Sequence, residues 1–167
     1  DQGGGTRGLT LFIENGTLYA AVWNKAEENW GYKELQAEIT ANTRYTATLV
    51  MDGALPQDGT TSLYLNGVEV DSVSGVGYLY SHGDDIGIGE IQGSSIIHNG
   101  TVSSANMFNG TIETLAHYNA ALSGSDLTQL HDAMADGWLD TQPLPQPPAG
   151  SAYLYEDGVA FGDIGDV

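Results

Sequence analysis

Hydrophobic and polar residues alternate with a period of two over most of the first two-thirds of the chain, as they do in half-buried β-strands. Alternating runs occur at residues 9–14, 17–22, 45–51, 62–65, 68–70, 86–90 and 111–118. Asn15-Gly16 and Asn66-Gly67 each separate two of these runs, and Asn-Gly is the strongest short signal for a two-residue hairpin turn. Asp52-Gly53 predicts a further turn after the run at 45–51. The pattern predicts an all-β fold, an antiparallel β-sandwich or jelly roll.

A single short helix is predicted after these strands. Ser123 is expected to cap it, with Asp126 three residues on in a capping-box position. Gly137 is expected to end it. Apolar residues between these two points recur at helical spacing, namely Leu127, Leu130 and Met134.

The end of the chain has a different composition. Four of the five prolines lie within residues 142–148, which predicts an extended linker rather than a strand. After it, residues 151–167 alternate again around Asp157-Gly158, which predicts a β-hairpin. We therefore expect a sandwich over residues 1–140, a proline-rich linker over 141–150 and a hairpin tail over 151–167.

Composition and charge exclude several functions. The 167 residues include 22 Asp and Glu, 4 Lys and Arg and no cysteine, for a formal charge of −18. Thiol chemistry and cysteine-based metal sites are excluded, and too few basic residues are present to neutralise nucleic-acid phosphates. No apolar run approaches the roughly 20 residues of a membrane-spanning helix, so membrane insertion is not expected. The acidity is compatible both with a solvated surface in salty water and with carboxylates gathered for a hard cation such as Ca²⁺.

Five ordered segments resemble a known family. The most specific is the run from Met107 to Ser123, MFNGTIETLAHYNAALS. It follows a hairpin that ends at Trp23-Asn24 and the segments at 45–53, 62–70 and 86–89. Together these resemble the laminin G-like, concanavalin A-like jelly-roll domain of bacterial secreted and surface proteins, over about residues 9 to 137. The resemblance implies a concanavalin A-like antiparallel sandwich with one short C-terminal helix.

The chain departs from that family pattern in two ways. Glu113 stands where the family usually has Asp, which puts any cation role at that position in doubt. The chain also begins almost at the first hairpin, whereas the family usually opens with further strands. Residues 152–165 look like those opening strands displaced to the C-terminus. One hypothesis is that the tail folds back to complete the sandwich, and the other is that it begins the next domain of a longer chain.

Candidate calcium ligands lie around the predicted strand at 86–90. Adjacent carboxylates on a glycine-flanked turn, with further oxygen donors after the strand, could form much of an oxygen cage. The spacing is not that of an EF-hand, and solvated turn acids are the alternative explanation. The resemblance implies a calcium ion near the loop rim that helps to bind a glycan or a protein partner. The candidate ligands are Asp84, Asp85, Glu90, Asn99 and, in second rank, Asp52.

Candidate ligand-binding residues gather in two aromatic segments. An aromatic ring beside amide and carboxylate groups matches the apolar faces and hydroxyls of a sugar. One group lies in a segment expected to be a polar loop, residues 23–32, and the other precedes the expected calcium loop. Packing in the core is the alternative role for such rings. The candidates are Asn29, Trp30, Tyr32, Tyr80 and His82.

Motifs of catalysis are not found. The chain lacks a serine nucleophile elbow, a zinc-protease motif, a P-loop and a strand that presents paired carboxylates for glycoside hydrolysis. We therefore expect a non-enzymatic, calcium-dependent module that recognises a glycan or a surface protein, within a multidomain extracellular bacterial adhesin. A calcium-stiffened structural spacer, or an accessory domain of a secreted carbohydrate-active protein, is the alternative.

Overall fold

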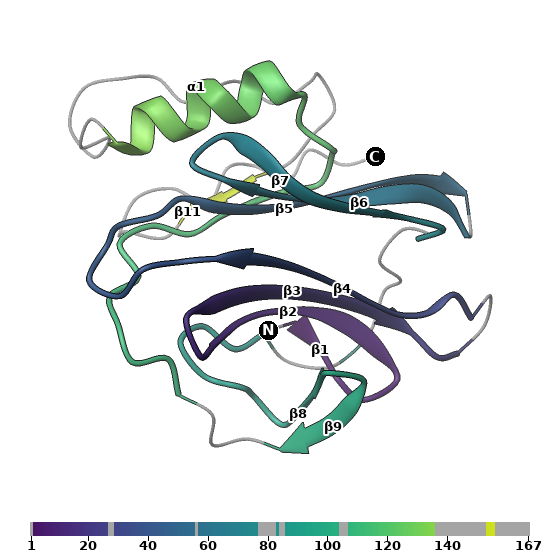
Figure 1. The fold of residues 1–167 in the computed structure, drawn as a ribbon. Helices are drawn as coiled ribbons and strands as arrows, with labels where there is room; N and C mark the ends of the chain where they lie inside the picture. Colours follow the sequence, from purple (N-terminus) through teal and green to yellow (C-terminus); the bar gives the residue numbers. More distant parts are fainter. Residues whose placement is uncertain are drawn as a thin grey trace.

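The structure is a computed structural model, and it describes residues 2–26, 29–55, 57–76, 83, 86–103, 107–135 and 153–155. Its main body is a sandwich of two antiparallel sheets (Figure 1). Sheet A has the strand order β1-β2-β3-β4 and sheet B the order β5-β6-β7. The bounds are β1 Gln2–Gly3, β2 Arg7–Glu14, β3 Thr17–Asn24, β4 Gly31–Glu38, β5 Ala47–Leu55, β6 Asp58–Leu65 and β7 Val68–Ser74.

Further elements cover the outer sides of the two sheets. The hairpin of β8 (Ser94–Ile97) and β9 (Gly100–Ser103) lies on the outer side of sheet A, and helix α1 (Gly124–Ala135) lies on the outer side of sheet B (Figure 1). The remaining strands, β10 (Ala116–Tyr118) and β11 (Tyr153–Tyr155), pair with each other. Over the residues that the structure describes, the predicted all-β sandwich with one short helix is confirmed.

Both predicted Asn-Gly hairpins are present. Asn15 and Gly16 join β2 to β3 with φ values of 51° and 80°, and Asn66 and Gly67 join β6 to β7 with 52° and 76°. Positive φ at both central residues is the requirement of a type I′ turn, whose twist matches that of the flanking strands. These turns fix the register of each pair, so that Phe12 lies opposite Tyr19 on the neighbouring strand.

The helix begins as the sequence predicts. The Asp126 N–H donates to Ser123 Oγ at 3.3 Å, and the Ser123 N–H donates to Asp126 Oδ2 at 3.0 Å. These two bonds form a reciprocal capping box. After this cap, Leu127 and Leu130 of the helix are buried and pack against Val50 of sheet B. Gly137, the predicted end of the helix, lies outside the described residues.

Three strand predictions are wrong in detail. The chain does not turn at Asp52-Gly53, because β5 continues to Leu55 and Gly53 pairs with Gly59. Residues 86–90 form no strand: Ile86 and Glu90 are isolated bridge residues, of which Glu90 pairs with Met107, and Gly89 has a φ of +76° that breaks extended backbone. The predicted strand at 111–118 is limited to β10. In addition, β4 begins inside the segment for which the sequence predicts a loop.

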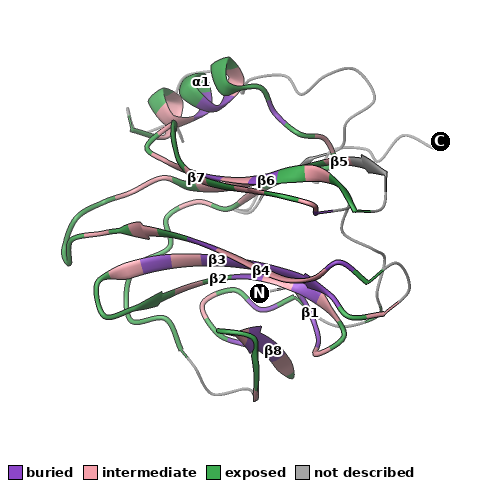
Figure 2. Ribbon diagram, turned by 45° about the vertical axis from the view of Figure 1, so that its right-hand side comes forward, coloured by how far each residue is buried: buried purple, intermediate pink, exposed green. Residues whose placement is uncertain are grey.

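Alternating residues of β3 build the interior on both sides of sheet A. Leu18, Ala20 and Val22 face sheet B, where they pack with residues such as Leu63 and Val76. Ala21 and Trp23 face the other way and pack with Ile96 of β8. As a result β3 is buried along most of its length (Figure 2). The outer face of sheet A is thus partly covered by β8, with which it forms a second hydrophobic core, and partly exposed to solvent.

The tail contributes one described strand. Tyr153–Tyr155 pairs antiparallel with β10 of the same chain, with Tyr153 opposite Tyr118 and Tyr155 opposite Ala116. Intramolecular pairing is what the fold-back hypothesis requires for these three residues. The linker and the rest of the tail lie outside the described residues, so the boundaries at 140 and 150 stay predictions.

Candidate functional site on the outer face of sheet A

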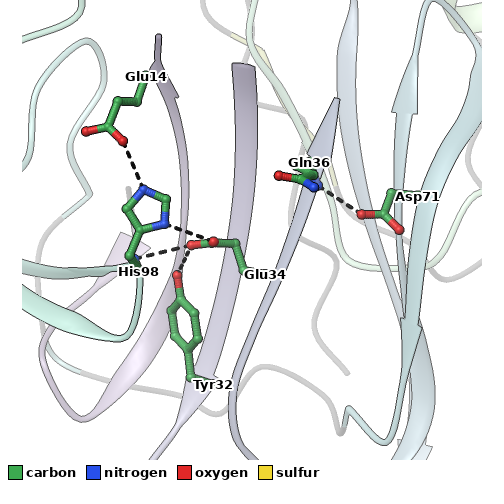
Figure 3. A network of polar contacts seen from close by, with 6 residues as sticks. All are labelled: Glu14, Tyr32, Glu34, Gln36, Asp71 and His98. Carbon is green, nitrogen blue, oxygen red and sulfur yellow. Dashed lines mark hydrogen bonds and ion pairs between the residues drawn. The ribbon is translucent and has the colours of Figure 1, made fainter. Parts of the chain in front are cut away.

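The part of this face that β8 and β9 leave uncovered carries a group of polar and aromatic side chains. Because side chains alternate across a strand, Phe12 and Glu14 of β2 share one face with Tyr19 of β3. Tyr32 and Glu34 of β4 lie on the same face, opposite Trp23 and Ala21. The turn of the β8–β9 hairpin then brings His98, which is 64 residues after Glu34 in the sequence, onto them (Figure 3). We call Glu14, Tyr32, Glu34 and His98 the His98 cluster.

His98 is held between two carboxylates. Its backbone N–H donates to Glu34 Oε2 at 3.2 Å, and its Nδ1 lies 3.0 Å from Glu34 Oε1. On the other side of the ring, Nε2 lies 3.2 Å from Glu14 Oε2. The Tyr32 hydroxyl also donates to Glu34 Oε2. Since ionised carboxylates only accept hydrogen bonds, the imidazole satisfies both of them only when both of its nitrogens carry protons.

A stacked aromatic pair lies beside the cluster. The rings of Phe12 and Tyr19 stack with centroids 5.0 Å apart and planes 14° from parallel. The His98 ring is nearly perpendicular to both of them, at 5.3 Å and 84° to Phe12 and at 4.8 Å and 87° to Tyr19. Such perpendicular contacts are a favourable arrangement of aromatic rings. The aromatic pair therefore helps to hold the His98 ring in place between its two carboxylates.

The electrostatics of the cluster agree with its geometry. The hydrogen bond to Glu34, and secondly that to Glu14, raises the pKa of His98 above its ordinary value. Burial raises the pKa of Tyr32, and its hydrogen bond to Glu34 raises it further. The side chain of Glu34 is 22% exposed, whereas those of His98 and Glu14 are 42% and 54% exposed. Glu34 is thus the inner carboxylate of the cluster, and Glu14 is the outer one.

Comparison with known proteins identifies the family. The family model Laminin_G_3, described as the concanavalin A-like lectin/glucanases superfamily, matches residues 1–128. The chain belongs to this superfamily. A search of the curated proteins finds no match. Among solved structures, the laminin G-like chain is similar to an S-layer domain-containing protein of Clostridium thermocellum (residues 221–444), with 18% identity and a TM-score of 0.45. The match covers 78% of this chain and 59% of that one.

Within this laminin G-like domain, the predicted ligand-binding residues separate. Tyr32 belongs to the His98 cluster. The Asn29 side chain accepts a hydrogen bond from the Gly31 N–H at 2.8 Å and so shapes the start of β4. Of the two roles left open for Trp30, ligand contact and core packing, the structure shows packing: the residue is 8% exposed and packs with Val22 and Val76. Tyr80 and His82 lie outside the described residues.

The predicted calcium ligands are not brought together in the described part of the laminin G-like domain. Asp52 is on β5 of sheet B, Glu90 bridges to Met107, and Asn99 is in the β8–β9 turn on the far side of sheet A. Asp84 and Asp85 lie outside the described residues. Among the residues that are described, no group of three or more His, Asp or Glu side chains could hold a metal ion. Nor is any helix there long and apolar enough to span a membrane.

The most connected residues of this site, Glu14, Glu34 and His98, were not predicted. One signal was available: Tyr32, Glu34, Gln36 and Glu38 alternate in the sequence as strand residues on one face would. Recognition of β4 would have placed Glu34 beside Tyr32. The position of His98 had no such local signal, because it depends on where the β8–β9 hairpin docks.

The His98 contacts predict a pH-dependent stability. The pKa of His98 is raised in the folded state, so the protonated ring stabilises the fold. This contribution to the free energy of unfolding is complete below the ordinary histidine pKa near 6.5, and it is lost as the pH rises through the folded-state pKa. Between about pH 6 and 9 the free energy of unfolding should fall by up to about 1 kcal/mol. The effect is small because the side chains of His98 and Glu14 are about half exposed to solvent. Urea unfolding across this range checks it. The His98→Gln variant should flatten the profile, and an unchanged slope would contradict the assignment.

Proposed function

We propose that this domain is a non-catalytic glycan-binding module of a multidomain extracellular bacterial protein with an adhesive role, and that its binding surface is the outer face of sheet A. The observation that carries the proposal is the stacked Phe12–Tyr19 pair beside the half-exposed Glu14. A half-buried aromatic pair offers apolar surface to the C–H groups of a pyranose, and a carboxylate beside it accepts hydrogen bonds from hydroxyls. Membership of a lectin/glucanase superfamily supports the same choice of ligand.

The placement of His98 supports a binding role rather than hydrolysis. Glycosidases place two carboxylates about 5–10 Å apart with the scissile bond between them. Glu14 and Glu34 do face each other, but the His98 ring occupies the space between them and contacts both. The two oxygens of Glu34 are also engaged by His98 and Tyr32. A glycosidic bond would have to displace the ring before either carboxylate could act on it.

Calcium dependence is a separate part of the proposal. The described carboxylates form no cation site, so the ion would be held by the loop that contains Asp84 and Asp85. Two adjacent carboxylates provide hard oxygen ligands, and a bound cation would offset part of the charge of −18. The role of calcium in this proposal is to order that loop, apart from the sugar contact on sheet A.

The test is binding of the whole chain to a panel of immobilised glycans, followed by titration calorimetry with the best ligand. We expect Tyr19→Ala to weaken binding at least about tenfold, because a stacked aromatic at a binding site contributes on the order of 1–2 kcal/mol. Tyr64→Ala is the matched control, since Tyr64 is a half-buried tyrosine on sheet B that packs against the α1 region. Both variants should lose similar stability, and only the first should lose affinity.

Repeating the titration with millimolar Ca²⁺ and with EDTA tests the calcium part. If calcium orders the loop that contains Asp84 and Asp85, EDTA should lower the melting temperature, because an ion that binds only the folded state stabilises it. A lower affinity in EDTA as well would show that this loop also contributes to sugar binding. Equal affinities and equal melting temperatures in both buffers would reject calcium dependence. They would not contradict the proposed binding surface on sheet A. If no glycan in the panel binds, the spacer role gains support over recognition.

A further inference from the structure

The two carboxylates of the His98 cluster are not equivalent toward a ligand. Glu34 is the inner one, with Oε1 on His98 Nδ1 and Oε2 on the His98 N–H and the Tyr32 hydroxyl. Glu14 makes one polar contact to the described residues, from Oε2 to His98 Nε2, and its side chain is 54% exposed. Its other oxygen is therefore available to a molecule that rests on the neighbouring aromatic rings.

Charge balance within the cluster favours a cation at that oxygen. Two carboxylates face one imidazole, so at least one unit of negative charge stays uncompensated in the cluster even when His98 is protonated. The surrounding chain strengthens this preference, because its formal charge is −18. A ligand ammonium could donate to Glu14 in a charge-assisted hydrogen bond.

The Phe12–Tyr19 pair argues that the cation belongs to a sugar rather than to a free ion. The two rings stack on each other and are only half-buried, so the apolar surface that they leave open can pack against the C–H face of a pyranose. Glu14 is on the same face of β2, two residues after Phe12, so a sugar ring packed on this pair has its substituents beside the carboxylate.

We infer that Glu14 selects the ligands of this surface by their charge. The preferred glycans carry protonated amino sugars, whereas neutral sugars bind less well and acidic sugars are rejected. This inference rests on the proposed glycan-binding function and specifies its substrate class. Glu14 is the specificity-determining residue, and Glu34 is a positioning residue that holds His98 and Tyr32 in place.

The test uses three β-1,4-linked oligosaccharides of equal length that differ only at carbon 2 of each ring. These are oligomers of glucosamine, N-acetylglucosamine and glucose, which present an ammonium, an amide and a hydroxyl. Titration calorimetry with the whole chain at mildly acidic pH should show the glucosamine oligomer binding about tenfold or more tightly than the other two, as expected for a charge-assisted hydrogen bond. Glu14→Gln should abolish this preference, so that the glucosamine oligomer binds no more tightly than the two neutral oligomers.

A matched control separates a specific contact from general attraction to an acidic protein. Asp132→Asn removes the same charge from an exposed position on α1, on the opposite side of the sandwich, and should leave the preference intact (Figure 1). If Asp132→Asn and Glu14→Gln reduce glucosamine binding equally, the assignment of Glu14 is overturned. If the neutral oligomers bind as tightly as the charged one, the inference fails while the proposed function stands. If none of the three binds but another glycan of the panel does, the inference likewise fails alone.

Discussion

Replacing Trp23 with alanine is expected to lower the free energy of unfolding by about 3–5 kcal/mol, the usual cost of deleting a buried tryptophan side chain. Trp23 has no exposed surface and packs against Ala21 and Ile96, with Phe12 and Tyr32 at the edge of the same cluster. Its Nε1–H also donates to the Gly4 carbonyl oxygen at 2.8 Å in the interior. One side chain therefore joins sheet A, the β8–β9 hairpin and the N-terminal segment.

Two further variants separate the causes of that loss. Trp23→Phe keeps an aromatic ring but leaves the buried Gly4 carbonyl without its donor, which should cost about 1–3 kcal/mol. Leu11→Ala removes a large apolar side chain from the adjacent strand, but Leu11 is 38% exposed, so its cost should be well below that of Trp23→Ala. Urea unfolding followed by circular dichroism measures all three. Equal costs for Trp23→Ala and Leu11→Ala would contradict the second core between sheet A and β8.

Features that depend on neighbouring residues were predictable from the sequence. The two Asn-Gly hairpins and the Ser123 capping box follow from residues within a few positions of one another, and all of them are present. Family membership was predictable for a similar reason, since it rests on short ordered segments such as 107–123. The false strand at 86–90 shows the limit of local pattern, because its alternating glycines fit a strand by period but leave few side chains to pack there.

The candidate site depends on contacts between distant parts of the chain. His98 is 64 residues from Glu34 and 84 residues from Glu14, so no local window contains the cluster. Two folding events have to be known first: the register of β2, β3 and β4, and the docking of the β8–β9 hairpin through Ile96. Trp30 depends on distant contacts in the same way, since its polar sequence neighbours left its role open and tertiary packing buried it.

Replacing Gly59 with alanine is the second large loss that we expect, at about 3 kcal/mol, because overpacking against backbone cannot be relieved by a side-chain rotation. A Cβ atom at this position would lie 2.5 Å from the Gly53 Cα and 2.6 Å from the Val76 carbonyl oxygen, and close to the Asp52 carbonyl oxygen. The Gly59 carbonyl also accepts a hydrogen bond from the Gly75 N–H at 3.0 Å. Gly59 is therefore a point of close approach between β5, β6 and the segment after β7.

Two other glycines provide controls that separate close approach from backbone conformation. A Cβ atom added to Gly124, at the start of α1, would meet nothing within 4 Å, so Gly124→Ala should be neutral or slightly stabilising through helix propensity. Gly31 is equally open but has a φ of +81°, so Gly31→Ala should cost only about 1–2 kcal/mol of left-handed strain. Urea unfolding should thus rank the losses as Gly59, then Gly31, then Gly124. A Gly59→Ala loss no greater than that of Gly31→Ala would show that β5 and β6 can separate at this point, and that the edge of sheet B yields to an added methyl group.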